Sequence, residues 1–148
     1  MASGRGLRKN TPLDITVGDV TGDGRPDVVT DSPSNSPFAG IEVFAANPSG
    51  TLKVPRMYTT LDIPGPMRVA DLNGDRRGDL VVEHTDWGYV GVMLQRPNGT
   101  LAPETLYPVK DCCDFGPDEP GVGDLNGDGK PDIAVNADAA GVAILYGK

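Results

Sequence analysis

Cysteine and histidine are scarce in this chain of 148 residues, which has two cysteines and one histidine. Cys112 and Cys113 are adjacent, so they cannot tie distant parts of the chain together. The alternatives are two free thiols, intermolecular bridges or a strained vicinal disulfide, and an oxidising compartment favours the last. Their spacing fits neither a redox CxxC motif nor a structural zinc site, and His84 gives zinc no convincing second ligand.

Catalytic motifs are missing as well. The sequence contains no nucleophile elbow and no phosphate-cradling GxxxxGK loop. A single histidine leaves few ways to build an acid–base constellation. We therefore predict no catalytic residues and expect the chain not to be an enzyme.

Long apolar runs and helical patterns are also absent. No segment is long and apolar enough to cross a membrane, and the opening MASGRGLRKN lacks the apolar region of a secretory signal. No window shows an apolar face at helical spacing. Aromatic residues are 5% of the chain, whereas 20 glycines and 14 prolines mark frequent turns. These features favour short strands over helices, with no membrane insertion.

Positively charged residues are fewer than negatively charged ones. The chain has 13 Lys and Arg and 21 Asp and Glu, which gives a formal net charge of -8. Nucleic acids and anionic membranes both bind basic surfaces. The balance therefore argues against both as partners.

Much of the acid is concentrated in one motif. VGDLNGDGKPDIAVN, residues 122–136, recurs as VGDVTGDGRPDVVT and VADLNGDRRGDLVVEH, whose first aspartates are Asp19 and Asp71. The copies are 52 and 53 residues apart, a period that indicates a propeller, solenoid or array. Pro48, Gly50, Thr51, Leu52 and Tyr58 recur 49 residues later, so the repeat covers nearly the whole chain.

The spacing within the motif points to calcium. Carboxylates about 4 Å apart repel by ~1 to 4 kcal/mol per pair at a protein surface, so the cluster requires a cation. Oxygens at positions 1, 3 and 5, a glycine at position 6 and a carbonyl at position 7 are how a short loop wraps calcium. The next carboxylate comes at position 9, Asp132, while position 12 is Val135. The loop is therefore not an EF-hand.

The DLNGDGKPDIAV core and the period near fifty resemble the FG-GAP/VCBS-type repeats of integrin α-subunit propellers, propeller lectins and secreted bacterial proteins. The resemblance implies β-propeller blades of four antiparallel strands, with Ca²⁺ in the hairpin between the first and second strands. It implies up to three Ca²⁺, one per repeat, that rigidify these hairpins. The implied ligands, with position 7 acting through its carbonyl, are Asp19, Thr21, Asp23, Arg25 and Asp27; Asp71, Asn73, Asp75, Arg77 and Asp79; and Asp124, Asn126, Asp128, Lys130 and Asp132.

The second loop departs from this pattern. It has Arg76 where the others have glycine, and Gly78 where they have proline. A tight turn at position 6 then forces a non-glycine residue into an unfavourable backbone region. We expect this loop to bind calcium most weakly. In the first loop, Thr21 is a poorer ligand than the asparagine of the other two.

We predict an all-β fold of β-propeller blades with about three repeats in a single repeat domain, 1–148. Repeat 1 spans 13–60, repeat 2 spans 61–109, and repeat 3 spans 110–148 and lacks its last strand. In repeat 2 the predicted strands are 67–70, 80–84, 89–94 and 105–107, bounded by turn residues. Propellers close with about 4 to 8 blades. Closure is therefore expected from self-assembly, most simply two chains in a six-bladed ring, or from a longer propeller of which this chain is a fragment.

Because successive strands of a blade alternate in direction, the loops predicted to bind metal lie at one end of the blades. A second set of connections lies at the other end. Variable connections carrying aromatics are where a scaffold binds partners, and Trp87 beside Asp86 could stack on a sugar. Alternatively, Trp87 caps the edge of the core. The candidate ligand-binding residues at this second end are Phe38, His84, Asp86, Trp87, Cys112, Cys113 and Phe115.

These patterns predict a calcium-stabilised binding module for carbohydrate or for an extracellular protein. Extracellular or cell-surface placement is expected because millimolar calcium suits weak, exposed loops. The alternatives are an enzyme or accessory domain, such as a propeller polysaccharide lyase or hydrolase using His84 and Asp86, or a structural spacer of a surface protein.

Overall fold

Strands make up the regular secondary structure of the described residues in the computed structural model. The structure describes residues 12–32, 37–84, 86–110, 112, 119–137 and 141–148. Within these ranges there is no α-helix, and hence no helix able to span a membrane. The all-β prediction is confirmed.

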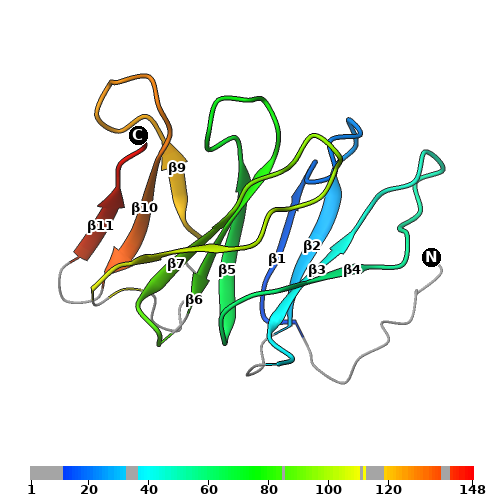
Figure 1. The fold of residues 1–148 in the computed structure, drawn as a ribbon, viewed down its shortest axis with the longest axis horizontal. Coiled ribbons are helices and arrows are strands. Elements are labelled where there is room, and N and C mark those ends of the chain that lie inside the picture. The colour runs from blue at the N-terminus through cyan, green and yellow to red at the C-terminus, as the bar shows by residue number, and fades with distance from the viewer. Residues whose placement is uncertain (1–11, 33–36, 85, 111, 113–118, 138–140) are drawn as a thin grey trace.

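The described residues contain eleven strands, which form three antiparallel sheets that stand side by side in chain order (Figure 1). The first sheet contains β1 (Ile15–Gly18), β2 (Asp27–Ser32), β3 (Gly40–Phe44) and β4 (Arg56–Thr59). The second contains β5 (Pro64–Ala70), β6 (Asp79–His84), β7 (Tyr89–Met93) and β8 (Thr105–Pro108). The third contains β9 (Gly121–Gly123), β10 (Asp132–Ala137) and β11 (Gly141–Leu145).

Each sheet is a simple meander in which every strand pairs with the next along the chain. The four strands predicted for repeat 2 correspond to β5, β6, β7 and β8. The third sheet has three described strands. Among the described residues, the three sheets do not close into a propeller.

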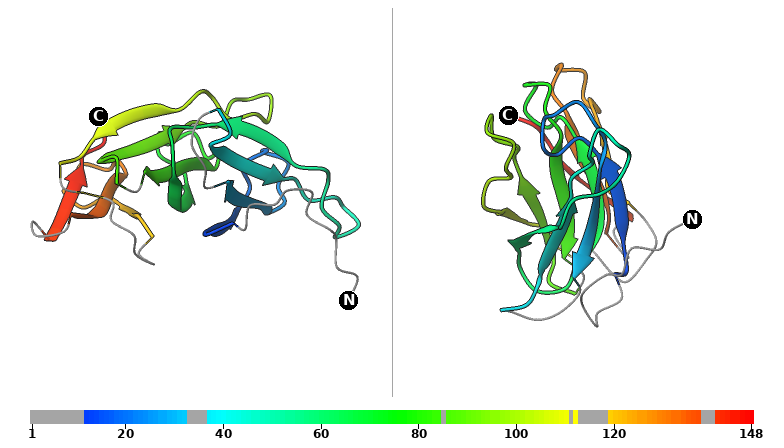
Figure 2. Two further views of the ribbon diagram at one scale, coloured as in Figure 1. Left: turned by 90° about the horizontal axis from the view of Figure 1, so that it is seen from below. Right: turned by 90° about the vertical axis from the view of Figure 1, so that its right-hand side faces the viewer.

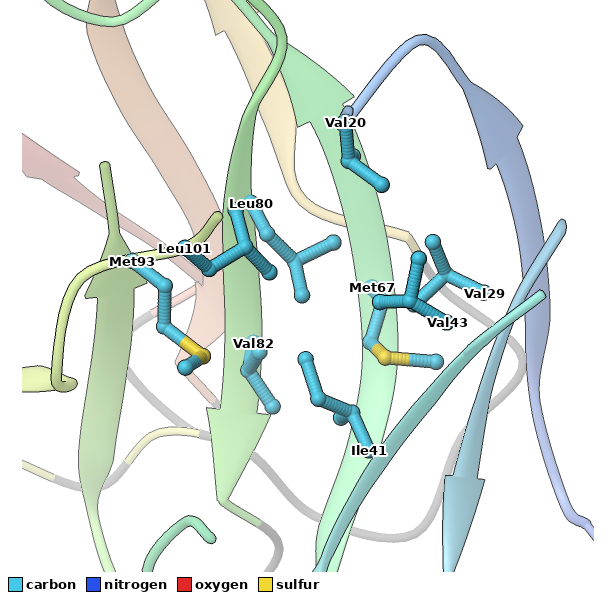
Figure 3. Packing of buried hydrophobic residues seen from close by; sticks show 9 residues of the cluster. All are labelled: Val20, Val29, Ile41, Val43, Met67, Leu80, Val82, Met93 and Leu101. Carbon is cyan, nitrogen blue, oxygen red and sulfur yellow. The ribbon is translucent and has the colours of Figure 1, made fainter. Parts of the chain in front are cut away.

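Packing between sheets explains the strand sequences. One buried cluster joins the first and second sheets and includes Val29, Ile41, Met67, Leu80 and Val82 (Figure 3). The three sheets follow one another along an arc (Figure 2). Each fully buried side chain of this size contributes about 1.5–3 kcal/mol, so the interface between sheets is a main source of stability.

The middle sheet is buried on both faces. On β6, Leu80 and Val82 belong to the cluster with the first sheet, while Val81 belongs to the cluster with the third. Ile133 and Val135 of β10 complete the second cluster. A strand buried on both faces loses the apolar–polar alternation, which is why Leu80, Val81 and Val82 are consecutive apolar residues in β6.

Glycines set how closely the first two sheets approach. A Cβ at Gly18 would lie 2.5 Å from a methyl carbon of Val69, and one at Gly78 would collide with the carbonyl oxygen of Asp19. Gly78 replaces the proline of the other repeats because the backbone of the first loop occupies that space. In addition, the Asp14 carboxylate accepts a hydrogen bond from the Met67 amide at 2.7 Å. β1 and β5 are therefore held together by backbone proximity as well as by apolar packing.

The outermost faces of the first and third sheets are not covered. Ile15 and Val17 of β1 are 59% and 60% exposed, and Val142 and Ile144 of β11 are 66% and 41% exposed. Alternate residues on the same strands face the second sheet, so each outer sheet has an apolar exposed face. These two faces lie at opposite ends of the row of sheets.

Candidate functional site

The three acidic loops lie at the same end of the three sheets, along the upper edge in Figure 1. They connect β1 to β2, β5 to β6 and β9 to β10. Their positions are numbered here from the first aspartate, so that Asp71, Asp75 and Asp79 are positions 1, 5 and 9 of the second loop.

The aspartate at position 1 organises each loop. In the second loop, Asp71 Oδ1 accepts hydrogen bonds from the amides of Gly74 at 2.8 Å and Asp75 at 3.1 Å, and Oδ2 accepts one from Arg76 at 2.8 Å. Asp19 and Asp124 make the equivalent three bonds in their own loops. The side chain at position 1 therefore fixes the turn that follows it.

These amide bonds change the acidity of Asp71. Its slight burial acts to raise the pKa, but hydrogen bonds from the amides of residues 73–76 outweigh that effect and hold the pKa below the usual value. The ionised form is thus favoured at position 1.

The aspartate at position 9 has a structural role that the sequence did not predict. Asp27, Asp79 and Asp132 are fully buried. One oxygen of Asp79 accepts from Leu72 at 2.9 Å, and the other accepts from Gln95 at 2.7 Å, just beyond the end of β7. The same pair of bonds joins Asp27 to Thr21 and Ala46, and Asp132 to Leu125 and Gly147. Each of these carboxylates ties its loop to the end of the third strand of the same sheet.

Burial raises the pKa of Asp79, because removing the carboxylate from water penalises its ionised form. The amides of Gln95 and Leu72 act in the opposite direction, and the charges of Asp75 and Asp71 add to the rise. Like charges in the second loop therefore repel one another, as the sequence predicted.

The residue at position 7 separates the loops into two kinds. Arg25 pairs with Asp23 and donates from Nε to the Ala46 carbonyl at 3.2 Å. Arg77 does the same with Asp75 and the Gln95 carbonyl, at 3.1 Å. Lys130 has no ion pair within the described ranges, so the acids of the third loop are not neutralised in this way.

Position 6 behaves as the sequence predicted. Gly24 and Gly129 have φ of 80° and 82°, and Arg76 is held in the same left-handed region at φ 65°. This conformation costs a non-glycine residue on the order of 1 kcal/mol or more. The predicted unfavourable backbone region at Arg76 is confirmed.

The loops fit calcium in donor chemistry. Positions 1, 3, 5 and 9 supply carboxylate, amide or hydroxyl oxygens, and a carboxylate has about four acceptor sites, of which the amide bonds leave some free. Thr21 Oγ1, at position 3, is buried without a hydrogen-bond partner. Among the described residues, however, no three acidic, His or Cys side chains are gathered as a metal-binding group.

The opposite end of the sheets presents two of the predicted ligand-binding aromatics. Phe38 is 67% exposed and Trp87 is 47% exposed, in the connections that follow β2 and β6. Asp86, exposed beside Trp87, has φ 64°, and the Trp87 amide bonds to the His84 carbonyl at 3.1 Å. This exposure favours a surface role for Trp87 over the core-capping alternative.

Two other candidates lie elsewhere. His84 is fully buried, and its ring bonds to Glu104 at 2.7 Å and to the Asp62 carbonyl at 3.2 Å, not to Asp86. Cys112 is 5% exposed, disulfide-bonded and packed in the cluster between the second and third sheets. Neither side chain lies on a ligand surface, because both are buried. Cys113 and Phe115 lie outside the described residues.

Comparison with known families supports the repeat assignment. Residues 71–135, from the second acidic loop through β10, match the model of an FG-GAP-like repeat. A search of curated proteins gave no match. The resemblance drawn from the motif and its period is therefore confirmed over this stretch.

We expect positions 9 and 5 of the second loop to differ sharply in their effect on stability. Without calcium, Asp79→Ala leaves two amides unpaired at about 1–3 kcal/mol each, partly offset by relief of the buried charge, for a net loss of about 2–5 kcal/mol. Asp75→Ala removes a partly exposed ion pair and should cost less than about 1 kcal/mol. Urea unfolding in excess chelator measures both, and equal losses would contradict the assigned roles.

Proposed function

Because the chain carries an FG-GAP-like repeat, we propose that it is a β-propeller-type binding module stabilised by calcium and placed outside cells or on their surface. The observation that carries the proposal is the separation of two kinds of loop. Acidic, internally bonded loops occupy one end of all three sheets, while exposed Phe38 and Trp87 occupy the other. Binding residues commonly lie on loops that a rigid scaffold positions, so this separation fits a binding module.

The sheet arrangement supports the propeller reading. Successive antiparallel meanders of four, four and three described strands pack face to face along an arc, and the chain passes from the last strand of one sheet to the first strand of the next (Figure 2). Repetition of this step leads to a ring of blades. The uncovered faces around Ile15 and Val142 are the surfaces at which further blades pack.

Carbohydrate is the ligand class that Trp87 favours. An exposed indole offers a flat apolar surface, and the neighbouring Asp86 carboxylate accepts hydrogen bonds from hydroxyl groups. A protein-adhesion surface uses the same aromatics and is the other outcome of the binding test below. The enzyme alternative loses its sequence support, because His84 is buried against Glu104.

Calcium is expected to raise the melting temperature, because it binds the folded loops and not the unfolded chain. The third loop should contribute most, since Asp128 has no arginine partner, whereas Asp75 is paired with Arg77 and Arg76 holds a strained backbone conformation in the second loop. Melting curves in millimolar calcium and in excess chelator test this, with magnesium as the control cation. Asp128→Ala should lose more of the calcium-dependent shift than Asp75→Ala.

Identical curves with and without calcium would refute the metal proposal. Equal losses in the two variants would instead refute the ranking of the loops.

Trp87→Ala should abolish ligand binding while leaving the calcium-dependent melt unchanged, because the side chain lies at the end opposite the metal loops. A glycan array and a panel of extracellular matrix proteins, each probed with and without calcium, provide the binding measurement. Tyr146→Ala is the matched control, since Tyr146 is an aromatic with 58% exposure beyond the end of β11. A collapsed melt in Trp87→Ala would show that the indole supports the core instead.

Self-association should follow from the two uncovered sheet faces, because exposed apolar faces of this kind drive association. We propose that a second copy covers them, giving a closed ring of six blades. Light scattering should show a dimer or a larger closed assembly, and the double variant Ile15→Glu, Val142→Glu should be monomeric. Val54→Glu, at an 86% exposed position outside both faces, is the control. A folded wild-type monomer at micromolar concentration would overturn this proposal.

A further inference from the structure

The connection between β7 and β8 contains Asn98, Gly99 and Thr100, a sequence that matches the acceptor motif for N-linked glycosylation. The same residues have a simpler explanation, because Asn-Gly is also the pair that a tight two-residue hairpin turn prefers. In that turn both central residues have positive φ. The backbone of Asn98 and the contacts of its side chain distinguish the two explanations.

The conformation of Asn98 excludes the Asn-Gly hairpin turn. Gly99 has φ of 73°, whereas Asn98 is not among the non-glycine residues of positive φ in the described part of the chain. The Gly99 amide donates to the Arg96 carbonyl at 2.9 Å, so Pro97 and Asn98 are the central residues of the turn. Proline is favoured at the first central position of such a turn and glycine at its fourth position. The backbone therefore does not require asparagine at position 98.

The matching turn of the first repeat shows that another residue serves equally well. Ser49 stands there in the place of Asn98. The Gly50 amide donates to the Asn47 carbonyl at 2.9 Å, and Gly50 has φ of 78°. In both repeats, the amide of the first turn residue also donates to a threonine carbonyl at 2.7 Å. Since serine and asparagine give the same backbone bonds, the turn does not explain the choice of asparagine.

The side chain of Asn98 leaves its amide nitrogen unpaired. Asn98 is exposed, and its Oδ1 accepts hydrogen bonds from the Thr100 amide at 3.2 Å and from Thr100 Oγ1 at 2.8 Å. A backbone amide can only donate, so the side-chain atom that faces it is the oxygen and not the nitrogen. Nδ2 forms no hydrogen bond with any residue that the structure describes. A group attached to Nδ2 would therefore break no bond within this part of the protein.

We propose that Asn98 is the acceptor of an N-linked oligosaccharide. In the transfer, Nδ2 gives up a proton to a base and forms a bond to the anomeric carbon of the sugar. The bond from that carbon to the phosphate of an activated sugar donor breaks, and the phosphate leaves with the electron pair. The attached oligosaccharide is bulky and solubilising, so it requires a surface position such as this turn.

This proposal rests on the extracellular or cell-surface placement proposed above, because the acceptor motif has this meaning in secreted proteins. The modified turn lies at the end of the sheets that carries the acidic loops, since β7 runs toward that end. Trp87 lies in the connection at the opposite end. An oligosaccharide on Asn98 therefore leaves the surface around Trp87 free.

The test is secretion of the full chain, fused to a cleavable leader, from cells that attach N-linked oligosaccharides. Peptide mapping by mass spectrometry, before and after enzymatic release of these oligosaccharides, identifies the modified residue. Most of the secreted wild type should be modified on Asn98. Asn98→Gln and Thr100→Val should carry no oligosaccharide at this turn, whereas Thr100→Ser keeps the motif and should still be modified. Asn98→Gln should also keep the calcium-dependent melt of the wild type.

Ser49→Asn is the matched control, because it places Asn-Gly-Thr in the corresponding turn of the first repeat. This variant should gain a second oligosaccharide, at position 49. Secreted wild type without an oligosaccharide on Asn98 would overturn the proposal, and it would leave the extracellular placement and the calcium-dependent melt untouched. Retention of the wild type and of Asn98→Gln inside the cells would instead count against the extracellular placement, and against this proposal with it.

Discussion

The bond between a buried aspartate and two backbone amides is the constraint on which each sheet depends. Asp27, Asp79 and Asp132 hold the turn after the first strand against the end of the third, so one side chain fixes two connections at once. An apolar residue at this position would leave two amides unpaired, and an asparagine would direct a donor at a donor. The ninth position is thus restricted to aspartate by backbone geometry, whether or not a metal is bound.

The close contact between the first two sheets depends on the same loops. Because the first loop is fixed in place, its Asp19 and Thr21 carbonyls can approach the second sheet closely, and Gly78 and Gly99 leave room for them. This contact buries the Gln95 amide, whose Nε2 donates to the Asp19 carbonyl at 3.3 Å and whose Oε1 has no hydrogen-bond partner. A loop that served calcium alone would not need such a close fit to its neighbour. The first loop therefore has a packing role as well as any role in metal binding.

The sequence predicted the periodic part of this structure and missed what depends on contacts between repeats. Strands, sheet division and the left-handed Arg76 follow from local spacing and turn chemistry, which single-sequence patterns carry directly. The burial of His84 against Glu104 and of Cys112 between sheets depends on residues 20 or more positions away or on a neighbouring sheet. The sequence motif identified the three aspartates at position 9, which are Asp27, Asp79 and Asp132. It did not predict their hydrogen bonds to the amides of Ala46, Gln95 and Gly147, because these residues lie outside the motif.

Arginine pairing lowers the repulsion between the loop carboxylates, and this pairing differs from sheet to sheet. Arg25 and Arg77 lower the repulsion in the first two loops with a cation that is always present. The third loop lacks this pairing and belongs to a sheet of three described strands, covered on one face only. Segments with fewer buried contacts open most readily. A cation bound at Asp124 and Asp128 would thus act mainly on local opening of the third sheet, where internal packing gives the least support.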